Sequence, residues 1–123
     1  LGGWRRQYII KRMDASNIPY TFMDRPPFDT LNKMYNSLDL YIVSSRFEGG
    51  PQSIPECAAT KTPIISTNVG CAEIYLSPES IFDFPNYKES SPNCDHAFEK
   101  AKEKFIPKGF NPYQKMFKNV LGS

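Results

Sequence analysis

Two glutamates, Glu48 and Glu56, flank a turn that is rich in Gly and Pro, with seven residues between them. Adjacent glycines at 49 and 50 permit a positive φ and a close approach of the backbone to a ligand. A helical pattern begins at about Ser53, and the free N–H groups of a helix start carry partial positive charge that suits phosphate oxygens. Ligands of open α/β sheets commonly bind at such turns, outside the carboxyl ends of the strands. The stretch therefore predicts a phosphate-binding turn with two carboxylates beside it.

The two carboxylates suit different parts of a ligand. An ionised carboxylate repels a diphosphate, so Glu56, in the first turn of the helix, is better used on a neutral diol such as a ribose, from which it accepts two hydrogen bonds. Glu48, across the turn, would face whatever is attached to the phosphates. By spacing alone, both residues could equally be ordinary acids of a surface turn and of a first helical turn.

Buried strands must hold this turn in place. Residues 39–43 are largely apolar and partly β-branched, which is typical of a parallel strand covered on both faces. Ser53 is the expected cap of the following helix, and Pro55 is tolerated in its first turn. The small apolar face of that helix is expected to comprise Ile54, Ala58 and Ala59. Residues 64–65 are predicted to form the next strand, and the extended pattern that follows them ends at Gly70.

The rest of the chain continues this alternation of strands and helices, which predicts an α/β sandwich with a mainly parallel sheet. Further strands are predicted at 17–23 and 81–84, with a surface loop at 85–92. Further helices are predicted at 4–13, about 29–38, 93–105 and 111–121. The expected caps are Asp29 or Thr30, Asn93 or Asp95, and Asn111.

Two of these helices carry apolar stripes at helical spacing. The stripe of the second helix consists of Leu31, Met34, Tyr35 and Leu38. The stripe of the last helix consists of Tyr113, Met116, Phe117, Val120 and Leu121. Packing in the core is the expected role of both.

The turn and its flanks resemble a known family. The run S-R-F-E-G-G-P from Ser45, the acid Glu56 followed by C-A-A, and T-P-I-I-S-T-N-V-G from Thr62 look like the C-terminal donor-binding domain of retaining glycosyltransferases with the GT-B fold. The mark of that domain is two glutamates separated by seven residues. The resemblance covers roughly residues 31–76. It departs at Ser44, Cys57 and Lys61, where proline, alanine and glycine are usual.

The resemblance implies a Rossmann-like three-layer sandwich, the C-terminal half of a GT-B fold. Residues 1–123 would form one partial domain that binds the nucleotide sugar, with the N-terminal acceptor domain absent. The chain opens on Leu1-Gly2-Gly3 without a Met, as an internal strand end would, so we expect a fragment. The terminal helix of the family often packs back toward the N-terminal domain, which would leave part of its stripe exposed here.

The same resemblance assigns roles by position. Glu48 would contact hydroxyls of the donor sugar and face the reacting centre. Glu56 would bind the ribose of the nucleotide. Backbone groups around Gly49, Gly50, Gln52 and Ser53 would hold the sugar and the phosphates. Pro51 supplies no N–H, so one donor available to other members is absent here.

The implied reaction is transfer of a hexosyl group from a nucleotide diphosphate sugar to an acceptor, with retention at the anomeric carbon. No metal or other cofactor is expected, since the chain has no Asp-x-Asp motif, and a helix start with cations can stabilise the leaving diphosphate. In the family, an Arg and Lys pair that serves the diphosphate lies upstream of the portion present, so the fragment alone is expected to be inactive. Two alternatives stay open: a degenerate, non-catalytic interaction module, and a nucleotide-sugar epimerase of the same architecture.

Several other polar residues have ordinary explanations. Cys94-Asp95-His96 holds the only histidine, and a capped helix start explains it better than a metal site. Arg46 and Lys61 could offset leaving-group charge or be solvated surface residues. Glu73 could approach the donor or cap a helix.

Composition limits the classes of binding partner and the cellular setting that we expect. A net charge of +2 with dispersed Lys and Arg does not favour nucleic acid. No signal peptide is visible, and no apolar run approaches the roughly 18 residues of a membrane span. Three cysteines without C-x-x-C spacing favour a reducing, cytoplasmic setting. The acceptor could be a glycan, a lipid or a protein. Contact with the inner face of a membrane would then come through the missing N-terminal domain.

Overall fold

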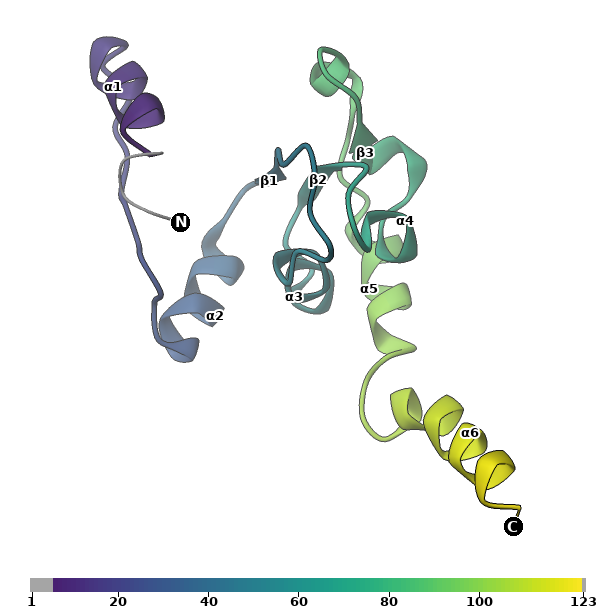
Figure 1. Cartoon of the computed structure of the whole chain (residues 1–123). Coiled ribbons are helices and arrows are strands. Elements are labelled where there is room, and N and C mark those ends of the chain that lie inside the picture. The colour runs from purple at the N-terminus through teal and green to yellow at the C-terminus, as the bar shows by residue number, and fades with distance from the viewer. Residues whose placement is uncertain (1–5, 123) are drawn as a thin grey trace.

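The computed structural model describes residues 6–122, and a small parallel sheet lies at its centre (Figure 1). The three strands are β1 (Tyr41–Val43), β2 (Ile64–Thr67) and β3 (Ile81–Phe82), in the order β1-β2-β3. Tyr41 lies opposite Ile64, and Ser66 lies opposite Ile81. Both pairs are parallel, so the α/β class with a parallel sheet is confirmed, as is the strand at 64–65. The strand predicted at 81–84 is confirmed only in its first half, since β3 covers Ile81 and Phe82 alone.

Helices connect the strands and extend the chain at both ends. The α-helices are α1 (Gln7–Ala15), α2 (Phe28–Ser37), α3 (Ser53–Thr60), α4 (Ala72–Tyr75), α5 (Cys94–Lys102) and α6 (Asn111–Leu121). Short 3₁₀ helices are η2 (Pro78–Ser80), η3 (Asn86–Glu89) and η4 (Lys108–Phe110). Helix α3 packs against α2, α4 and α5, whereas α1 and α6 stand away from the sheet (Figure 1).

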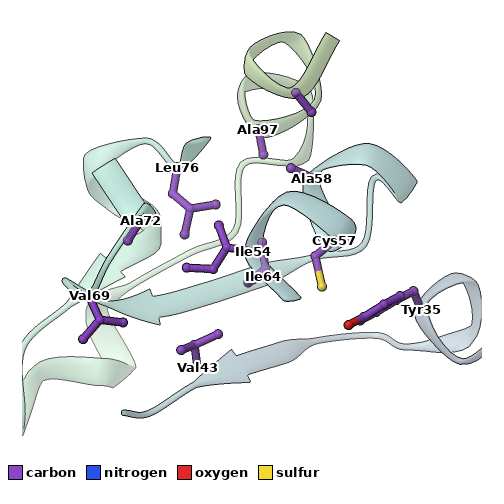
Figure 2. Close-up of a cluster of buried hydrophobic side chains, with 11 residues drawn as sticks. Tyr35, Val43, Ile54, Cys57, Ala58, Ile64, Val69, Ala72, Leu76 and Ala97 are labelled. Atoms are coloured by element: carbon purple, nitrogen blue, oxygen red, sulfur yellow. The ribbon is translucent and has the colours of Figure 1, made fainter. Parts of the chain in front are cut away.

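The core lies between one face of the sheet and helices α3 to α5 (Figure 2). Ile54 of α3 and Ile64 of β2 are among its largest fully buried side chains. The predicted face of α3 is confirmed, because Ile54 and Ala58 are buried and Ala59 is half-buried against them. The predicted stripe of α2 is confirmed too: Tyr35 is buried, and its other members pack on the same cluster.

The expected strand at residues 17–23 is wrong. This segment pairs with no strand in the part of the chain that the structure describes. It associates with α1 instead, where the Arg6 guanidinium lies 4.5 Å from the centre of the Phe22 ring and 3.5 Å from an Asp24 carboxylate oxygen. The preceding helix runs over 7–15 rather than 4–13, and the first residues of that prediction, Trp4 and Arg5, lie outside the described residues.

Strand β1 is covered on one face only, which corrects the expectation of burial on both. Val43 points into the core and is buried, whereas the neighbouring Ile42 is 53% exposed. The reason is position: β1 is the edge of the described sheet, and helices α3 to α5 pack on the face that carries Val43.

Most of the predicted caps are wrong, although the helices themselves are correct. Ser53 and Asn111 are the first residues inside their helices, because Gln52 and Phe110 before them already have helical backbone angles. Helix α2 begins after Pro27 without a side-chain cap, so neither Asp29 nor Thr30 is its N-cap. The prediction for α5 is confirmed: Asn93 Oδ1 accepts a hydrogen bond from the His96 N–H at 3.0 Å.

Helix α6 does not pack in the core, so the expected role of its apolar stripe is wrong. Phe117 is 58% exposed and Val120 is 77% exposed. The main contacts of α6 are with the adjoining η4, and the helix points away from the sheet (Figure 1).

Candidate functional site

The turn from residue 44 to 53 runs from the carboxyl end of β1 into α3 and is held against the next loop. Thr67 Oγ1 donates a hydrogen bond to the Ser45 carbonyl at 2.6 Å, which ties the turn to the end of β2. Gly70 has φ +53°, and a Cβ there would lie 2.8 Å from both N and Cα of Gly50. Two glycines in contact thus allow the two loops to meet backbone to backbone.

Glu56 lies in the first turn of α3 and is oriented by Tyr35 of α2. The Tyr35 hydroxyl donates a hydrogen bond of 2.7 Å to Glu56 Oε2. Burial, and then the hydrogen bond to Glu56 and its negative charge, raise the pKa of Tyr35 far above its usual value, so the phenol stays a donor. Glu56 is half-buried, and its Oε1 accepts no hydrogen bond from the residues that the structure describes.

A hollow of about 290 Å³ lies beside Glu56, between α2 and α3. Its lining is largely apolar and aromatic, with the carboxylate of Glu56 at one side. The other lining residues are Phe28, Leu31, Asn32, Tyr35, Ala59 and Thr60. This arrangement presents one oriented acceptor next to a surface suited to a flat or apolar group.

Glu48 is exposed in the turn. Burial raises the pKa of the Cys71 thiol, and the charge of Glu48 raises it further. The Cys71 Sγ lies 3.9 Å from the Pro51 carbonyl oxygen. Glu48 does not line the hollow beside Glu56. Of the two glutamates, only Glu56 borders that hollow.

The four backbone positions predicted to hold the ligand are open to it to different degrees. Gly49 and Gly50 are exposed, and no atom lies within 4 Å of where their Cβ atoms would be. Gln52 is exposed and precedes α3 directly, while Ser53 is half-buried. The turn thus leaves its glycine backbone accessible from solvent.

A second cavity, of about 450 Å³, follows the carboxyl ends of all three strands. Arg46 lines it, together with Ser45, Thr67, Asn68, Val69, Asp83 and Phe84. Of the two cations that the sequence left undecided, Arg46 is thus the one at the strand ends. The carboxylate of Glu73 is held by one of these lining residues, since its Oε1 accepts a hydrogen bond of 2.6 Å from Asn68 Nδ2.

Lys61 lies at the opposite end of α3 from the turn. It ends the helix in the left-handed conformation with φ 55°, where glycine is usual. Its Nζ lies 3.0 Å from Asp95 Oδ1 and 4.8 Å from the centre of the Phe98 ring.

Sequence reasoning missed the part that Tyr35 plays. It was assigned to the apolar stripe of α2 by spacing, and that placement is correct. The available signal was chemical: a buried tyrosine hydroxyl nearly always needs a hydrogen-bond partner, and a carboxylate on the adjacent helix can supply one.

Removing the Tyr35 hydroxyl should loosen Glu56. We expect Tyr35→Phe to lower the free energy of unfolding by about 1–2 kcal/mol, because a hydrogen bond to a charged acceptor is lost while the ring still packs. Urea unfolding measures this. Tyr41→Phe is the matched control, since Tyr41 is a half-buried tyrosine whose ring centre lies 5.7 Å from that of Tyr35. Equal costs for the two variants would contradict a special role of the Tyr35–Glu56 bond.

Cys57 is expected to make stability depend on pH in the alkaline range. Burial, and then the charge of Glu56, raise the pKa of the Cys57 thiol from 9.0 to about 12. A raised pKa favours the neutral thiol in the folded chain, so this contribution is complete below pH 9 and is lost as the pH rises toward 12. Wild type should therefore lose more stability between pH 8 and 11 than Cys57→Ala does. Cys94→Ala, at the half-buried start of α5, is the control and should follow wild type.

The prediction for His96 agrees with the structure. His96 lies in the first turn of a helix capped by Asn93, as expected. Within residues 6–122, no group of three or more His, Cys, Asp or Glu residues could hold a metal ion. All three cysteines are free thiols. No helix among the described residues has the length and apolar character required to cross a membrane.

Comparison with known families agrees with this geometry. Residues 2–88 match the family model described as glycosyl transferases group 1. The match spans most of the chain and contains all three strands and the turn with both glutamates, so the chain belongs to this family of glycosyltransferases. Glycosyltransferases move a sugar from a donor, in general a nucleotide sugar, to an acceptor. No curated protein and no solved structure matches the chain.

Proposed function

We propose that residues 1–123 are part of the C-terminal donor-binding domain of a retaining hexosyltransferase with the GT-B fold. The donor is a nucleotide diphosphate sugar, and the acceptor domain lies outside these residues. The observation that carries the proposal is the half-buried carboxylate of Glu56, oriented by Tyr35 at a helix start after a parallel strand.

The ribose is the group best suited to Glu56. An oriented carboxylate with a free oxygen can accept hydrogen bonds from the two hydroxyls of a ribose, and such charge-assisted bonds are stronger than neutral ones. The apolar hollow beside Glu56 offers a surface to the adjoining part of the nucleotide. The Tyr35 bond keeps the carboxylate from rotating before the ligand arrives. Tyr35 is therefore a positioning residue.

The diphosphate is expected at the start of α3. Pro51 and Pro55 carry no N–H, and the Ile54 N–H is donated to the Pro51 carbonyl at 3.1 Å. The N–H groups of Gly50, Gln52 and Ser53 are left to contact phosphate oxygens. We place the Arg46 guanidinium near the leaving diphosphate as well, because it lines the cavity at the strand ends. No cofactor besides the donor is required by this arrangement.

Glu48 is assigned to the sugar. It is exposed in the turn and does not line the hollow beside Glu56, so it is left for the group beyond the phosphates. A carboxylate there can accept hydrogen bonds from sugar hydroxyls and hold the anomeric carbon for transfer with retention. We place the reaction in the cytoplasm, where three free thiols are kept reduced.

A titration followed by amide shifts tests this proposal. UDP, GDP and ADP and their sugar conjugates are added to the labelled chain. The nucleotide with the right base is expected to shift the amide signals of residues 49 to 56, the two prolines excepted. Glu56→Gln should weaken binding of the nucleotide and of its sugar conjugate alike. Glu48→Gln should weaken only the sugar conjugate, toward the affinity of the bare nucleotide.

Glu73→Gln is the matched control, because Glu73 is a nearby exposed glutamate whose carboxylate is held by Asn68. It should bind both ligands as wild type does. Nucleotide binding that survives Glu56→Gln unchanged, or sugar conjugates that bind no differently after Glu48→Gln, would contradict the assigned roles.

A further inference from the structure

The cavity of about 450 Å³ at the strand ends receives one polar side chain from the loop after each of the three strands. Arg46 follows β1, Asn68 directly follows β2, and Asp83 directly follows β3. Ligands of open α/β sheets bind outside the carboxyl ends of parallel strands, and these three positions meet at that edge. The proposed contacts to the donor use only Arg46 of the three.

These side chains retain hydrogen-bonding capacity for a ligand. Within residues 6–122, no ion pair engages Arg46 or Asp83, either with each other or with another charged group. Asn68 donates an Nδ2 hydrogen to Glu73, and its Oδ1 accepts no hydrogen bond from the described residues. The cavity therefore offers guanidinium donors together with carboxylate and amide acceptors.

Phe84 adds an exposed aromatic surface to the same cavity. Its side chain is 55% exposed, and its ring centre lies 5.6 Å from that of the buried Phe82, with an angle of 89° between the rings. Such an edge-to-face contact is favourable, so it holds the ring in place while much of Phe84 stays open to solvent. The cavity thus combines a fixed apolar surface with donors and acceptors of hydrogen bonds.

We propose that this cavity binds a sugar ring of the acceptor, which makes the acceptor a saccharide. A hydroxyl both donates and accepts hydrogen bonds, so the neighbouring hydroxyls of a sugar can pair with Asp83 and Arg46 at the same time. The C–H groups of the ring can pack on Phe84. The inference rests on the proposed function, because it takes the donor to occupy the turn that holds Glu48 and Glu56.

The polar groups of the cavity disfavour the other candidate ligands. Asp83 repels phosphate oxygens, so the diphosphate is not expected to extend from Arg46 into the rest of the cavity. An acyl chain would desolvate both charged groups without pairing either, which is costly. The hydroxyl of a serine or threonine carries a single hydrogen, so it cannot satisfy Asp83 and Asn68 together.

Amide shifts of the labelled 123-residue chain test the proposal. Methyl glycosides of glucose, galactose, mannose and N-acetylglucosamine are titrated with and without the nucleoside diphosphate that binds best. At least one glycoside is expected to shift the signals of Asn68, Asp83 and Phe84. N-acetylserinamide, which carries the hydroxyl of a protein acceptor, should not shift them at the same concentration. The sugar of the donor has the same chemistry as the acceptor, so a nucleotide sugar is titrated as well and should shift Glu48 but not Asp83.

Two aspartate variants show whether the carboxylate makes the contact. Asp83→Ala should weaken glycoside binding at least about tenfold, because a hydrogen bond to a charged acceptor is lost. Its amide spectrum away from the cavity should match that of wild type, which shows that the variant is folded. Asp39→Ala is the matched control, since Asp39 is an exposed aspartate before β1, at the opposite end of the strands. It should bind the glycoside as wild type does.

Failure of this proposal and failure of the donor site give different results. Nucleotide shifts at residues 49–56 without any glycoside shift at Asp83 and Phe84, even in large excess, would overturn the saccharide site alone. So would equal shifts from N-acetylserinamide, equal effects of the two aspartate variants, or shifts of Asp83 by the nucleotide sugar but by no glycoside. Glycoside binding that depends on Asp83 in a chain that binds no nucleotide would support the saccharide site and contradict the donor site.

Discussion

Replacing Gly70 by alanine is expected to lower the free energy of unfolding by about 2–5 kcal/mol. Two costs add up. The residue has φ +53°, a left-handed conformation that costs a residue with a Cβ about 1–2 kcal/mol. The new Cβ would also lie 2.8 Å from backbone atoms of Gly50, and forcing such atoms apart typically costs about 1–3 kcal/mol. Because the displaced backbone belongs to the proposed phosphate-binding turn, nucleotide binding should fall too.

Two other glycines separate these costs. The Cβ added by Gly122→Ala would meet no atom within 4 Å, but Gly122 has φ +69°, so this variant isolates the conformational cost. The Cβ added by Gly49→Ala would meet no atom within 4 Å, and Gly49 has no positive φ, so the effect of this variant on stability should be close to zero. Urea unfolding of the three variants measures the series. A Gly70→Ala chain as stable as Gly49→Ala would show that the two loops are not in contact.

Ile54→Ala is expected to destabilise the chain by a similar amount, about 2–5 kcal/mol. Ile54 is fully buried in α3 and lies at the centre of the cluster between the sheet and the helices (Figure 2). Removing three methyl or methylene carbons forfeits their transfer free energy and leaves a cavity. A domain of this size has only several kcal/mol of stability, so the variant should be largely unfolded at moderate urea concentrations.

Ile42→Ala removes the same atoms from the exposed face of β1. Its cost should stay below about 1 kcal/mol, since more than half of the side chain already meets solvent. The ratio of the two costs, measured by urea unfolding, tests which face of the sheet carries the core. Similar losses for both variants would mean that Ile42 is also buried in solution.

The sequence was sufficient to predict the elements that build the site. The apolar run before Glu48 forms a strand and the small apolar face of α3 is buried, both as local rules predict, whereas Gly49 and Gly50 have no positive φ. Asn93 was predictable as a cap for the same reason, because its partner His96 is three residues away. The roles of Glu48 and Glu56 rest on the family pattern and stay predictions.

What the sequence could not supply depends on contacts between distant residues. Tyr35 and Glu56 are 21 positions apart, and no local pattern pairs them. Residues 17–23 have the composition of a strand but find no strand partner among the described residues, and composition cannot reveal that. The stripe of α6 has the spacing of a core helix, and spacing alone does not say what covers it.

The most direct test of the central claim is a thermodynamic cycle between Glu56 and the ribose hydroxyls. The nucleoside diphosphate that binds best and its 2′,3′-dideoxy analogue are each titrated into wild type and into Glu56→Gln. Wild type should lose at least about tenfold in affinity when the hydroxyls are removed, because hydrogen bonds to a charged acceptor are lost. Glu56→Gln should bind both ligands nearly alike. If both proteins lose the same factor, Glu56 does not bind the ribose, and the donor site as assigned here is wrong.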